Sequence, residues 1–299
     1  MFDLKSYLAT KQILINNLLQ ETIKKTSSSG RIFEAMEYSL MAGGKRIRPV
    51  LCMAACEAVN GNYKYALSAA CAIEMIHTYS LIHDDLPAMD DDILRRGKPT
   101  SHVKYDEATA ILAGDALLTL AFKTLSMAGL SEKDSDTAPL RWLEIICFIS
   151  KAAGCEGMIE GQMRDITSEK IILDFDQLEQ IHFLKTGALI KASVLTGAIL
   201  GKGTDEQLQQ LEVYGKNIGL AFQVIDEILN VEGDPLVMGK SAGTDTAHGK
   251  NTYPSLMGLA ESKKFVEKLI ATAVGSMDSF GAKADPLRAI ASYIIKRKK

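Results

Sequence analysis

The stretch LSAACAIEMIHTYSLIHDDLPAMDDD, residues 67–92, indicates the fold most directly. Its first part, up to Ile82, is apolar on nearly every side of a helix, as expected of a helix that other helices surround. Five carboxylates follow within the nine residues 84–92, and such a cluster is costly unless a cation compensates it. We therefore predict a core helix of a helical bundle, with a charged functional site at its carboxyl end.

The rest of the chain repeats the helical pattern. Apolar residues recur about every 3.6 positions, and the alternation typical of β-strands is almost absent. The connections at 26–30, 60–62 and 131–139 are short and polar, and none resembles a linker between domains. We therefore expect one all-α domain over residues 1–299, folded as a single large bundle. The predicted helices span residues 2–25, 31–41, 47–59, 63–86, 105–128, 140–163, 174–201, 205–231, 252–276 and 284–297.

Composition excludes several classes of protein. With 47% hydrophobic residues the chain can bury a large core, and its 34 Lys and Arg against 37 Asp and Glu give a net charge of −3. This balance offers no general attraction for nucleic acid or for an anionic membrane, so neither is expected as a partner. Each apolar stretch is interrupted before the roughly 18 residues of a membrane span, and the N-terminus lacks the pattern of a signal peptide. We expect a cytoplasmic protein without stable membrane insertion.

Cysteine usage points to the same compartment. The five cysteines, at positions 52, 56, 71, 147 and 155, are an odd number in apolar surroundings and form no CxxC pair. This pattern argues against a disulfide framework and against a structural zinc site, and it is typical of a reducing compartment.

The acidic cluster is typical of a site for a hard divalent cation. Mg²⁺ commonly binds through one or two protein carboxylates, several waters and the oxygens of a substrate phosphate. Asp84 and Asp90 are too far apart for one face of a regular helix, but Pro87 removes a backbone donor and should distort the turn between them. The alternative is an acidic helix end that faces solvent.

A second polar segment, FQVIDEILN at residues 222–230, follows 142 residues after the first. Gln223, Asp226, Glu227 and Asn230 are spaced so that they share one helix face within an otherwise apolar segment. Two such patches on core helices could face each other across a cavity of the bundle. A polar face turned towards water would give the same pattern.

Basic residues elsewhere in the sequence are candidates for binding phosphate groups. The pair Arg95-Arg96 follows the first cluster, and guanidinium groups are suited to bidentate phosphate binding. GGKRIRP at 43–49 combines glycines, which allow close backbone approach, with cations that could reach another anion. His77, about two helical turns before Asp84, and Lys185-Thr186 within an apolar helix are further candidates. A basic helix start, a satisfied core histidine and a structural ion pair are the alternatives for these residues.

The irregular segment 233–251 is rich in Gly and polar residues and contains two lysines. It fits a mobile lid or a solvated surface loop equally well.

Six segments occur in a fixed order: GGKRIRP (43–49), HTYSLIHDDLPAMDDDILRRGKPT (77–100), AGDALL (113–118), KTG (185–187), FQVIDEILN (222–230) and GKNTYP (249–254). Together they resemble the short-chain trans-prenyl diphosphate synthases, and among these the bacterial farnesyl diphosphate synthases, or geranyltranstransferases. The similarity spans roughly residues 30–258, and the first aspartate segment with its trailing RRGKPT is the most specific part.

The resemblance implies an all-α fold of the terpenoid-synthase type, usually a homodimer, with a deep central cavity. It implies three Mg²⁺ ions, for which Mn²⁺ could substitute, with Asp84, Asp90 and Asp226 as ligands. It also implies that isopentenyl diphosphate is condensed with dimethylallyl and geranyl diphosphate through an allylic cation. By motif match, the allylic diphosphate would be held by Arg95, Lys185 and Lys240, and isopentenyl diphosphate by Lys45, Arg48, His77 and Arg96.

Further roles follow from the same resemblance. Thr186, Gln223 and the carbonyl of Lys185 match groups that stabilise the allylic cation, and Lys250 falls in the segment that closes over the site. The C-terminal residues 296–299, KRKK, resemble a basic tail that helps to cover it.

The resemblance also implies that product length depends on the two residues four and five positions before the first aspartate, which in the family line the cavity floor and here are Ser80 and Tyr79. A tyrosine there, with the longer spacing of the first aspartate motif, resembles enzymes that stop at fifteen carbons, so we expect a farnesyl diphosphate synthase. The alternatives are a geranylgeranyl or longer-chain synthase and a non-catalytic subunit that binds prenyl diphosphates. A terpene cyclase shares the fold, but it would leave GGKRIRP unexplained and the chain lacks its second metal motif.

The second aspartate motif departs from the usual DDxxD, because Glu227 and Asn230 replace two of its aspartates. Glu227 keeps the charge on a longer arm, whereas Asn230 loses it. We therefore expect turnover to be retained, with Mg²⁺ affinity weakened by about 10- to 100-fold, as is common for changes around a metal site.

Overall fold

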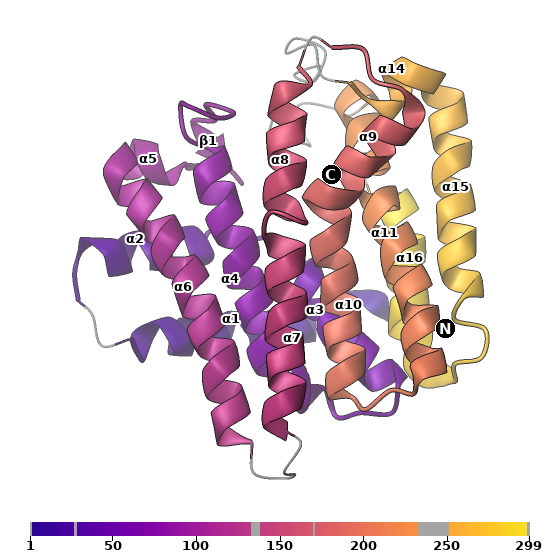
Figure 1. Cartoon of the computed structure of the whole chain (residues 1–299), viewed down its shortest axis with the longest axis horizontal. Helices are drawn as coiled ribbons and strands as arrows, with labels where there is room; N and C mark the ends of the chain where they lie inside the picture. The colour runs from indigo at the N-terminus through magenta and orange to yellow at the C-terminus, as the bar shows by residue number, and fades with distance from the viewer. Residues whose placement is uncertain (1, 27–28, 133–137, 170, 233–250, 298–299) are drawn as a thin grey trace.

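The computed structural model is an almost entirely helical bundle (Figure 1), which confirms the all-α prediction. It describes residues 2–26, 29–132, 138–169, 171–232 and 251–297. The helices are α1 (Leu4–Lys24), α2 (Arg31–Leu40), α3 (Ile47–Ala58), α4 (Leu67–Asp84), α5 (Ser101–Lys104), α6 (Glu107–Ser131), α7 (Ala138–Ala153), α8 (Met158–Thr167), α9 (Phe175–His182), α10 (Ala188–Leu200), α11 (Asp205–Glu232), α14 (Tyr253–Met257), α15 (Leu259–Gly275) and α16 (Asp285–Lys296). Short 3₁₀ turns lie at Tyr63–Ala66 and Ala282–Ala284, a π-helix at Phe183–Gly187, and two strands at β1 (Leu94–Arg95) and β2 (Lys98–Pro99).

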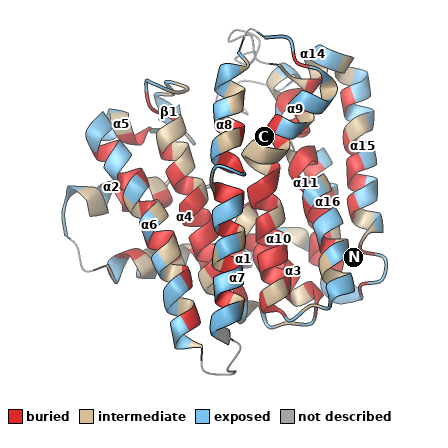
Figure 2. Ribbon diagram, in the orientation of Figure 1, coloured by how far each residue is buried: buried red, intermediate tan, exposed pale blue. Residues whose placement is uncertain are grey.

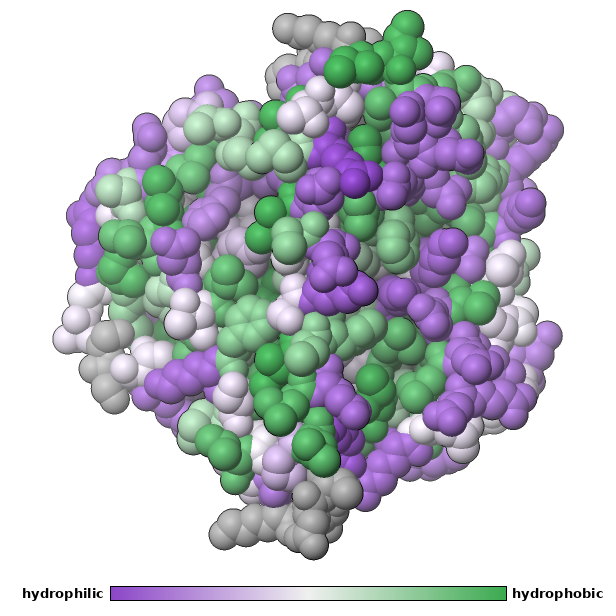
Figure 3. Space-filling view, in the orientation of Figure 1, coloured by the Kyte–Doolittle hydropathy of each residue, from purple (hydrophilic) through white to green (hydrophobic). Residues whose placement is uncertain are grey.

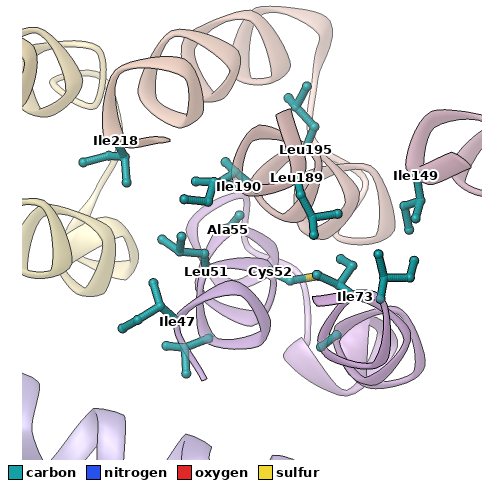
Figure 4. Packing of buried hydrophobic residues seen from close by; sticks show 14 of the residues in the cluster. Ile47, Leu51, Cys52, Ala55, Ile73, Ile149, Leu189, Ile190, Leu195 and Ile218 are labelled. Atoms are coloured by element: carbon teal, nitrogen blue, oxygen red, sulfur yellow. The ribbon is translucent and has the colours of Figure 1, made fainter. Parts of the chain in front are cut away.

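The core lies where α3, α4 and α10 pack against one another, and Figure 4 shows side chains such as Leu51, Ile73 and Leu189 meeting there. Buried residues concentrate on the inward faces of the helices (Figure 2). Close approach of α3 and α10 depends on Gly197, because a Cβ at this position would collide with the carbonyl oxygen of Cys52. The apolar helices therefore form a closely packed frame around the end of α4.

Several predicted helices are interrupted. The expected helix 140–163 is broken into α7 and α8 at Gly154–Gly157, because glycines disfavour the helix and Gly157 approaches the carbonyl of Ala152 too closely for a side chain. The expected helix 174–201 contains the π-helix between α9 and α10. The expected helix 252–276 is divided at Gly258, which has a φ of 81°. The expected helix 63–86 begins with a 3₁₀ turn and ends at Asp84.

The short hairpin of β1 and β2 was not predicted. Leu94 pairs with Pro99 and Arg95 with Lys98, and the two turn residues Arg96 and Gly97 have φ values of 55° and 75°. Positive φ at both central residues is the geometry that joins two twisted antiparallel strands with a two-residue loop. Strands of two residues are too short to give an alternating pattern, which is why the sequence did not reveal them.

The expectation that every apolar stretch is too short for a membrane span was wrong. The helical stretches 107–131 and 175–200 are long and apolar enough to span a membrane by length and composition, although 44% and 61% of their most apolar windows are buried within the fold. Core helices of globular proteins meet the same criterion, so this finding is weak evidence for a membrane. Cys147 and Cys155 are exposed, whereas the other three free cysteines are buried.

Candidate active site

One cavity of about 990 Å³ brings together most of the residues that the sequence singled out. Its volume lies at the upper end of the range for small-molecule sites. The carboxyl end of α4, the start of α3, α8, the π-helix and α11 form its walls. Among its lining residues are Lys45, Arg48, His77, Tyr79, Ser80, Asp84, Arg95, Arg96, Lys185, Thr186, Gln223 and Asp226.

The acidic end of α4 turns back on itself. The Asp90 amide donates to the Asp84 carbonyl over 2.9 Å, and the Asp91 amide donates to the Leu86 carbonyl over 3.1 Å. This turn, which contains Pro87, brings the backbone of Asp90 beside Asp84, but among the described residues Asp90 does not line the cavity. Burial raises the pKa of Asp84 to about 6; Lys185 opposes the shift and Asp90 adds to it. A cation at Asp84 would therefore relieve an unfavourable buried charge.

Other carboxylates of the same run bind Arg95. Arg95 Nε donates to Asp85 Oδ1 over 2.6 Å, and Arg95 Nη2 donates to Asp92 Oδ2 over 3.0 Å. Asp85 is buried, so this contact fixes the guanidinium at the cavity wall. The sequence suggested a single acidic cluster. The structure instead separates Asp84, which faces the cavity, from Asp85, which holds the Arg95 guanidinium in place.

The basic segment 43–49 is held by a residue that the sequence analysis missed. Arg46 adopts a left-handed φ of 52° and directs its side chain into the core. Its Nη1 donates to Glu74 Oε1 over 2.6 Å, its Nε to Asn16 Oδ1 over 2.9 Å and its Nη2 to the Leu40 carbonyl over 2.5 Å. Lys45 and Arg48, on either side of it, line the cavity, and the Arg46–Glu74 pair lies buried at the same wall.

Arg48, His77 and Arg96 form a positive corner of the cavity. The Nε of Arg48 is buried and has no hydrogen-bond partner among the described residues. Burial lowers the pKa of His77 well below its usual value, and Arg48 and Arg96 lower it further, so the imidazole is neutral at pH 7. Arg96 donates to the Gly43 carbonyl, and Gly44 has no room for a Cβ because the guanidinium lies against it. This corner is suited to an anion with several oxygens.

The π-helix presents Lys185 and Thr186 to the cavity. Lys185 Nζ contacts Asp165 Oδ2 at 2.5 Å, and Thr186 Oγ1 donates to Gln223 Oε1 over 3.2 Å. Gly161 on α8 allows this close packing, because a Cβ there would collide with the backbone nitrogen of Lys185. Single π-turns inside α-helices are frequent at functional sites. Asp165 is a second residue that the sequence analysis missed, since its partner lies 20 residues away.

Asp226 lies at the opposite wall with its side chain open to the cavity. Arg297, near the C-terminus, donates from Nη2 to Asp226 Oδ1 and to the Phe222 carbonyl, both over 2.7 Å. Its guanidinium carbon also lies 3.9 Å from the centre of the Phe222 ring. The surrounding protein raises the pKa of Asp226, and Arg297 opposes that shift. Arg297 thus acts as the counter-ion of Asp226 in this state of the protein.

The predicted position of Glu227 was wrong. It was expected to share a polar face with Asp226, but it is buried away from the cavity, where it contacts His182 and the backbone of Tyr253. Lys240, Lys250 and all of the predicted lid at 233–251 except Asn251 lie outside the described residues, so the roles of the two lysines and of the lid stay predictions.

A model of the polyprenyl synthetase family matches residues 30–284. The chain belongs to the polyprenyl synthetase family. Comparison of sequences and comparison of structures both find similar prenyl diphosphate synthases. The large subunit 1 of the chloroplastic heterodimeric geranylgeranyl pyrophosphate synthase of Arabidopsis thaliana is 48% identical over 99% of the chain and 80% of its own length.

Solved structures of polyprenyl synthetases have the same fold. An FPP/GFPP synthase from Zymomonas mobilis is 38% identical with a TM-score of 0.84, and 98% of each chain is covered. A putative farnesyl-diphosphate synthase from Marinomonas is 40% identical with a TM-score of 0.81, covering 99% of this chain and 100% of its own. The first matched relatives are plant geranylgeranyl synthases, so the narrower resemblance to bacterial farnesyl diphosphate synthases finds only partial support.

Proposed function

We propose that this prenyltransferase is a geranylgeranyl diphosphate synthase, which adds isopentenyl diphosphate head to tail to allylic diphosphates until the product has twenty carbons. The observation that carries this proposal is the 48% identity, over 99% of the chain, to a plant geranylgeranyl pyrophosphate synthase subunit. The lining of the cavity supports this chemistry, because acidic and basic groups suited to metal and diphosphate face the same space.

The donor set fits Mg²⁺. Asp84 and Asp226 offer hard carboxylate oxygens to the cavity, and burial disfavours their charge when no cation is near. In the part of the chain that the structure describes, no three acidic, histidine or cysteine side chains form a ready-made cage. This suits an ion that completes its shell with water and diphosphate oxygens. We propose that Asp84, Asp90 and Asp226 hold up to three Mg²⁺ ions, which when bound would neutralise charge on the departing diphosphate.

Other residues of the cavity are proposed to bind the two substrates and to stabilise the allylic cation. Arg95 and Lys185 are proposed to bind the allylic diphosphate, while Lys45, Arg48, Arg96 and neutral His77 bind isopentenyl diphosphate. The hydroxyl of Thr186, the amide oxygen of Gln223 and the Lys185 carbonyl can stabilise an allylic cation without attacking it. Apolar lining residues such as Met158, Met163 and Phe222 would help to exclude water, which would otherwise trap the cation.

Farnesyl diphosphate synthesis is the second candidate, and Tyr79 favours it. The ring lines the cavity with 6% of the residue exposed, and it packs edge-on against His83 with ring centres 5.7 Å apart. His83 Nε2 is in turn 3.0 Å from the Ile111 carbonyl, so the aromatic pair is fixed. A fixed ring at the end of a cavity limits the length of chain that it can hold.

Product chromatography distinguishes these functions. Purified protein would receive labelled isopentenyl diphosphate with dimethylallyl, geranyl or farnesyl diphosphate, across a titration of Mg²⁺ or Mn²⁺. A twenty-carbon product, with farnesyl diphosphate accepted as a substrate, supports the proposal. A product that stops at fifteen carbons, and that lengthens in Tyr79→Ala, supports the second candidate. No product, despite measurable diphosphate binding, would favour a non-catalytic subunit.

A homodimer is also proposed, with α6 and α7 at its interface. Large apolar side chains are exposed along both helices, and Figure 3 shows apolar groups on this face of the molecule. They include Ile111, Leu112, Met127, Leu130, Leu140 and Leu143. Exposed apolar surface of this kind is typical of a contact between protein chains. Light scattering of the purified chain tests the assembly.

A further inference from the structure

Glu227 occupies the second position of the second aspartate motif, yet its carboxylate does not reach the cavity. Its side chain is 4% exposed, and Oε2 accepts a hydrogen bond of 2.8 Å from the Tyr253 amide. The other oxygen, Oε1, lies 2.5 Å from His182 Nε2, in a contact that lacks the geometry of a regular hydrogen bond. Both oxygens are therefore engaged by protein groups on two other elements.

Helix geometry explains why Glu227 and Asp226 do different things. Neighbouring residues on an α-helix point about 100° apart, so Glu227 can face away from the cavity that Asp226 lines. Asp226 is directed into the cavity, and Glu227 is directed towards α9 and α14. A metal ion bound by Asp226 would thus not find the Glu227 carboxylate on its own side of α11.

The contact between Glu227 and His182 lies directly beside the π-helix. His182 is the last residue of α9, and the π-helix that carries Lys185 and Thr186 starts at the next residue. His182 is itself buried, and its ring lies 5.6 Å from that of Tyr253. Tyr253 is fully buried and also packs against Phe175 and Phe265 with ring centres 5.4 and 5.3 Å away. Glu227 thereby connects α11 to the start of the π-helix through a closely packed aromatic group.

The π-helix has little other freedom. Gly219 on α11 lies so close to Gly187 that a Cβ would be 2.7 Å from the Gly187 Cα, and Gly161 presses against Lys185 from α8. Because His182 directly precedes the π-helix, a displacement of His182 would shift Lys185 and Thr186 relative to Gln223 and Asp226. Misplacement of about 1 Å at a reacting centre can cost on the order of 100-fold in rate.

We propose that Glu227 is a positioning residue for the prenyl transfer: it holds His182 and the Tyr253 amide, and so sets the π-helix that presents Lys185 and Thr186. This proposal rests on the proposed function for its catalytic consequence. It also explains the departure from DDxxD at this position, because the additional methylene of glutamate lets one carboxylate reach both partners. The expected weakening of Mg²⁺ binding by the change at residue 227 is replaced by an effect on turnover.

The test compares Glu227→Gln with the wild type. Glutamine keeps the shape and can still accept from the Tyr253 amide, but it loses the charge that faces His182. His182→Gln removes the same contact from α9, and Asp226→Asn serves as the reference for a lost metal ligand. Glu232→Gln is the matched control, since Glu232 lies on the same helix and pairs with Lys263 at the surface over 2.8 Å.

Three readouts on the full chain separate the possibilities. Calorimetry measures binding of Mg²⁺ with inorganic diphosphate, hydrogen exchange measures opening at residues 182–187, and steady-state kinetics give kcat and KM for isopentenyl diphosphate. We expect Glu227→Gln to weaken binding of Mg²⁺ with inorganic diphosphate much less than Asp226→Asn does, to exchange faster at 182–187, and to lose about 10- to 100-fold in kcat with little change in the KM for isopentenyl diphosphate. The Glu227→Gln/His182→Gln double variant should lose no more than either single variant, because both remove one contact.

Two results would overturn the proposal. Glu227→Gln could weaken Mg²⁺ binding as much as Asp226→Asn, which would make Glu227 a metal ligand. Alternatively, its exchange at 182–187 and its kcat could match those of Glu232→Gln, and Glu227 would then position nothing. A wild type that forms no product would contradict the proposed function, whereas the exchange experiment would still decide whether Glu227 holds the π-helix.

Discussion

Replacing Arg46 by methionine tests how the basic segment beside the cavity is held. Arg46 Nη1 lies 2.6 Å from Glu74 Oε1, and the two side chains are 0% and 2% exposed. Removing the guanidinium leaves the Glu74 carboxylate buried without its cation, which costs about 3–5 kcal/mol in comparable cases. Methionine retains most of the apolar stem and, like arginine, is an L-residue at φ 52°, so the backbone strain is unchanged.

The loss converts into a measurable change in melting temperature. With an unfolding entropy of about 2.1 cal/mol/K per residue, the whole chain has about 0.63 kcal/mol/K. A loss of 3–5 kcal/mol then lowers Tm by about 5–8 °C. Because Lys45 and Arg48 flank Arg46 and line the cavity, the KM for isopentenyl diphosphate should rise in the same variant.

Calorimetric melting of three variants provides the assay. Lys264→Met breaks an exposed pair, Lys264 with Glu261, whose side chains are 71% and 58% exposed, and it should leave Tm unchanged within error. The double variant Arg46→Met/Glu74→Leu removes both buried charges and should recover most of the loss. A single variant that melts with the Lys264→Met control, or a double variant less stable than the single one, would refute the reasoning.

Four further predictions concern metal binding, pH dependence and assembly. Because Arg297 holds Asp226 Oδ1 over 2.7 Å, Arg297→Ala should lower several-fold the Mg²⁺ concentration that supports diphosphate binding in calorimetry; an unchanged demand would contradict competition between the guanidinium and the ion. With the pKa of Asp84 raised to about 6, apparent Mg²⁺ affinity should fall by up to about tenfold per pH unit below pH 6, and a flat titration would exclude Asp84 as a ligand. In the metal-free protein the same raised pKa means that the folded state binds the proton more tightly, so Asp84's contribution to stability declines as pH rises from about 4 to about 6 and Asp84→Asn should flatten Tm over that window. Leu112 and Leu143 are 54% and 56% exposed, and replacing both with Glu should give a monomer by light scattering; an unchanged mass would place any interface elsewhere.

The sequence contained enough information to assemble most of the site. Asp84 and Asp226 are 142 residues apart, yet each lies in a largely apolar segment, where a carboxylate needs a polar environment. The structure places both at one cavity. Residue type and helical spacing are local properties, so they can be recognised without knowledge of the packing.

What the sequence did not reveal depends on long-range packing. Arg46 lies at the cavity between Lys45 and Arg48, but its guanidinium is buried and paired with Glu74, which is 28 residues away. The π-helix at 183–187 changes the direction of Lys185 without changing the apolar pattern. Only the three-dimensional arrangement shows which charged groups bind one another and which remain available for a ligand.

The two acidic motifs therefore have the same arrangement, which their sequences alone do not show. In each, a carboxylate that faces the cavity is followed directly by one that holds the frame: Asp84 is followed by Asp85, which fixes Arg95, and Asp226 by Glu227, which contacts His182. The frame-holding members are buried at 3% and 4% exposure, where an unpaired charge is most costly and pairing most effective in fixing a position. A substitution at the second position of either motif should accordingly change the geometry of the catalytic groups before it changes the affinity for metal.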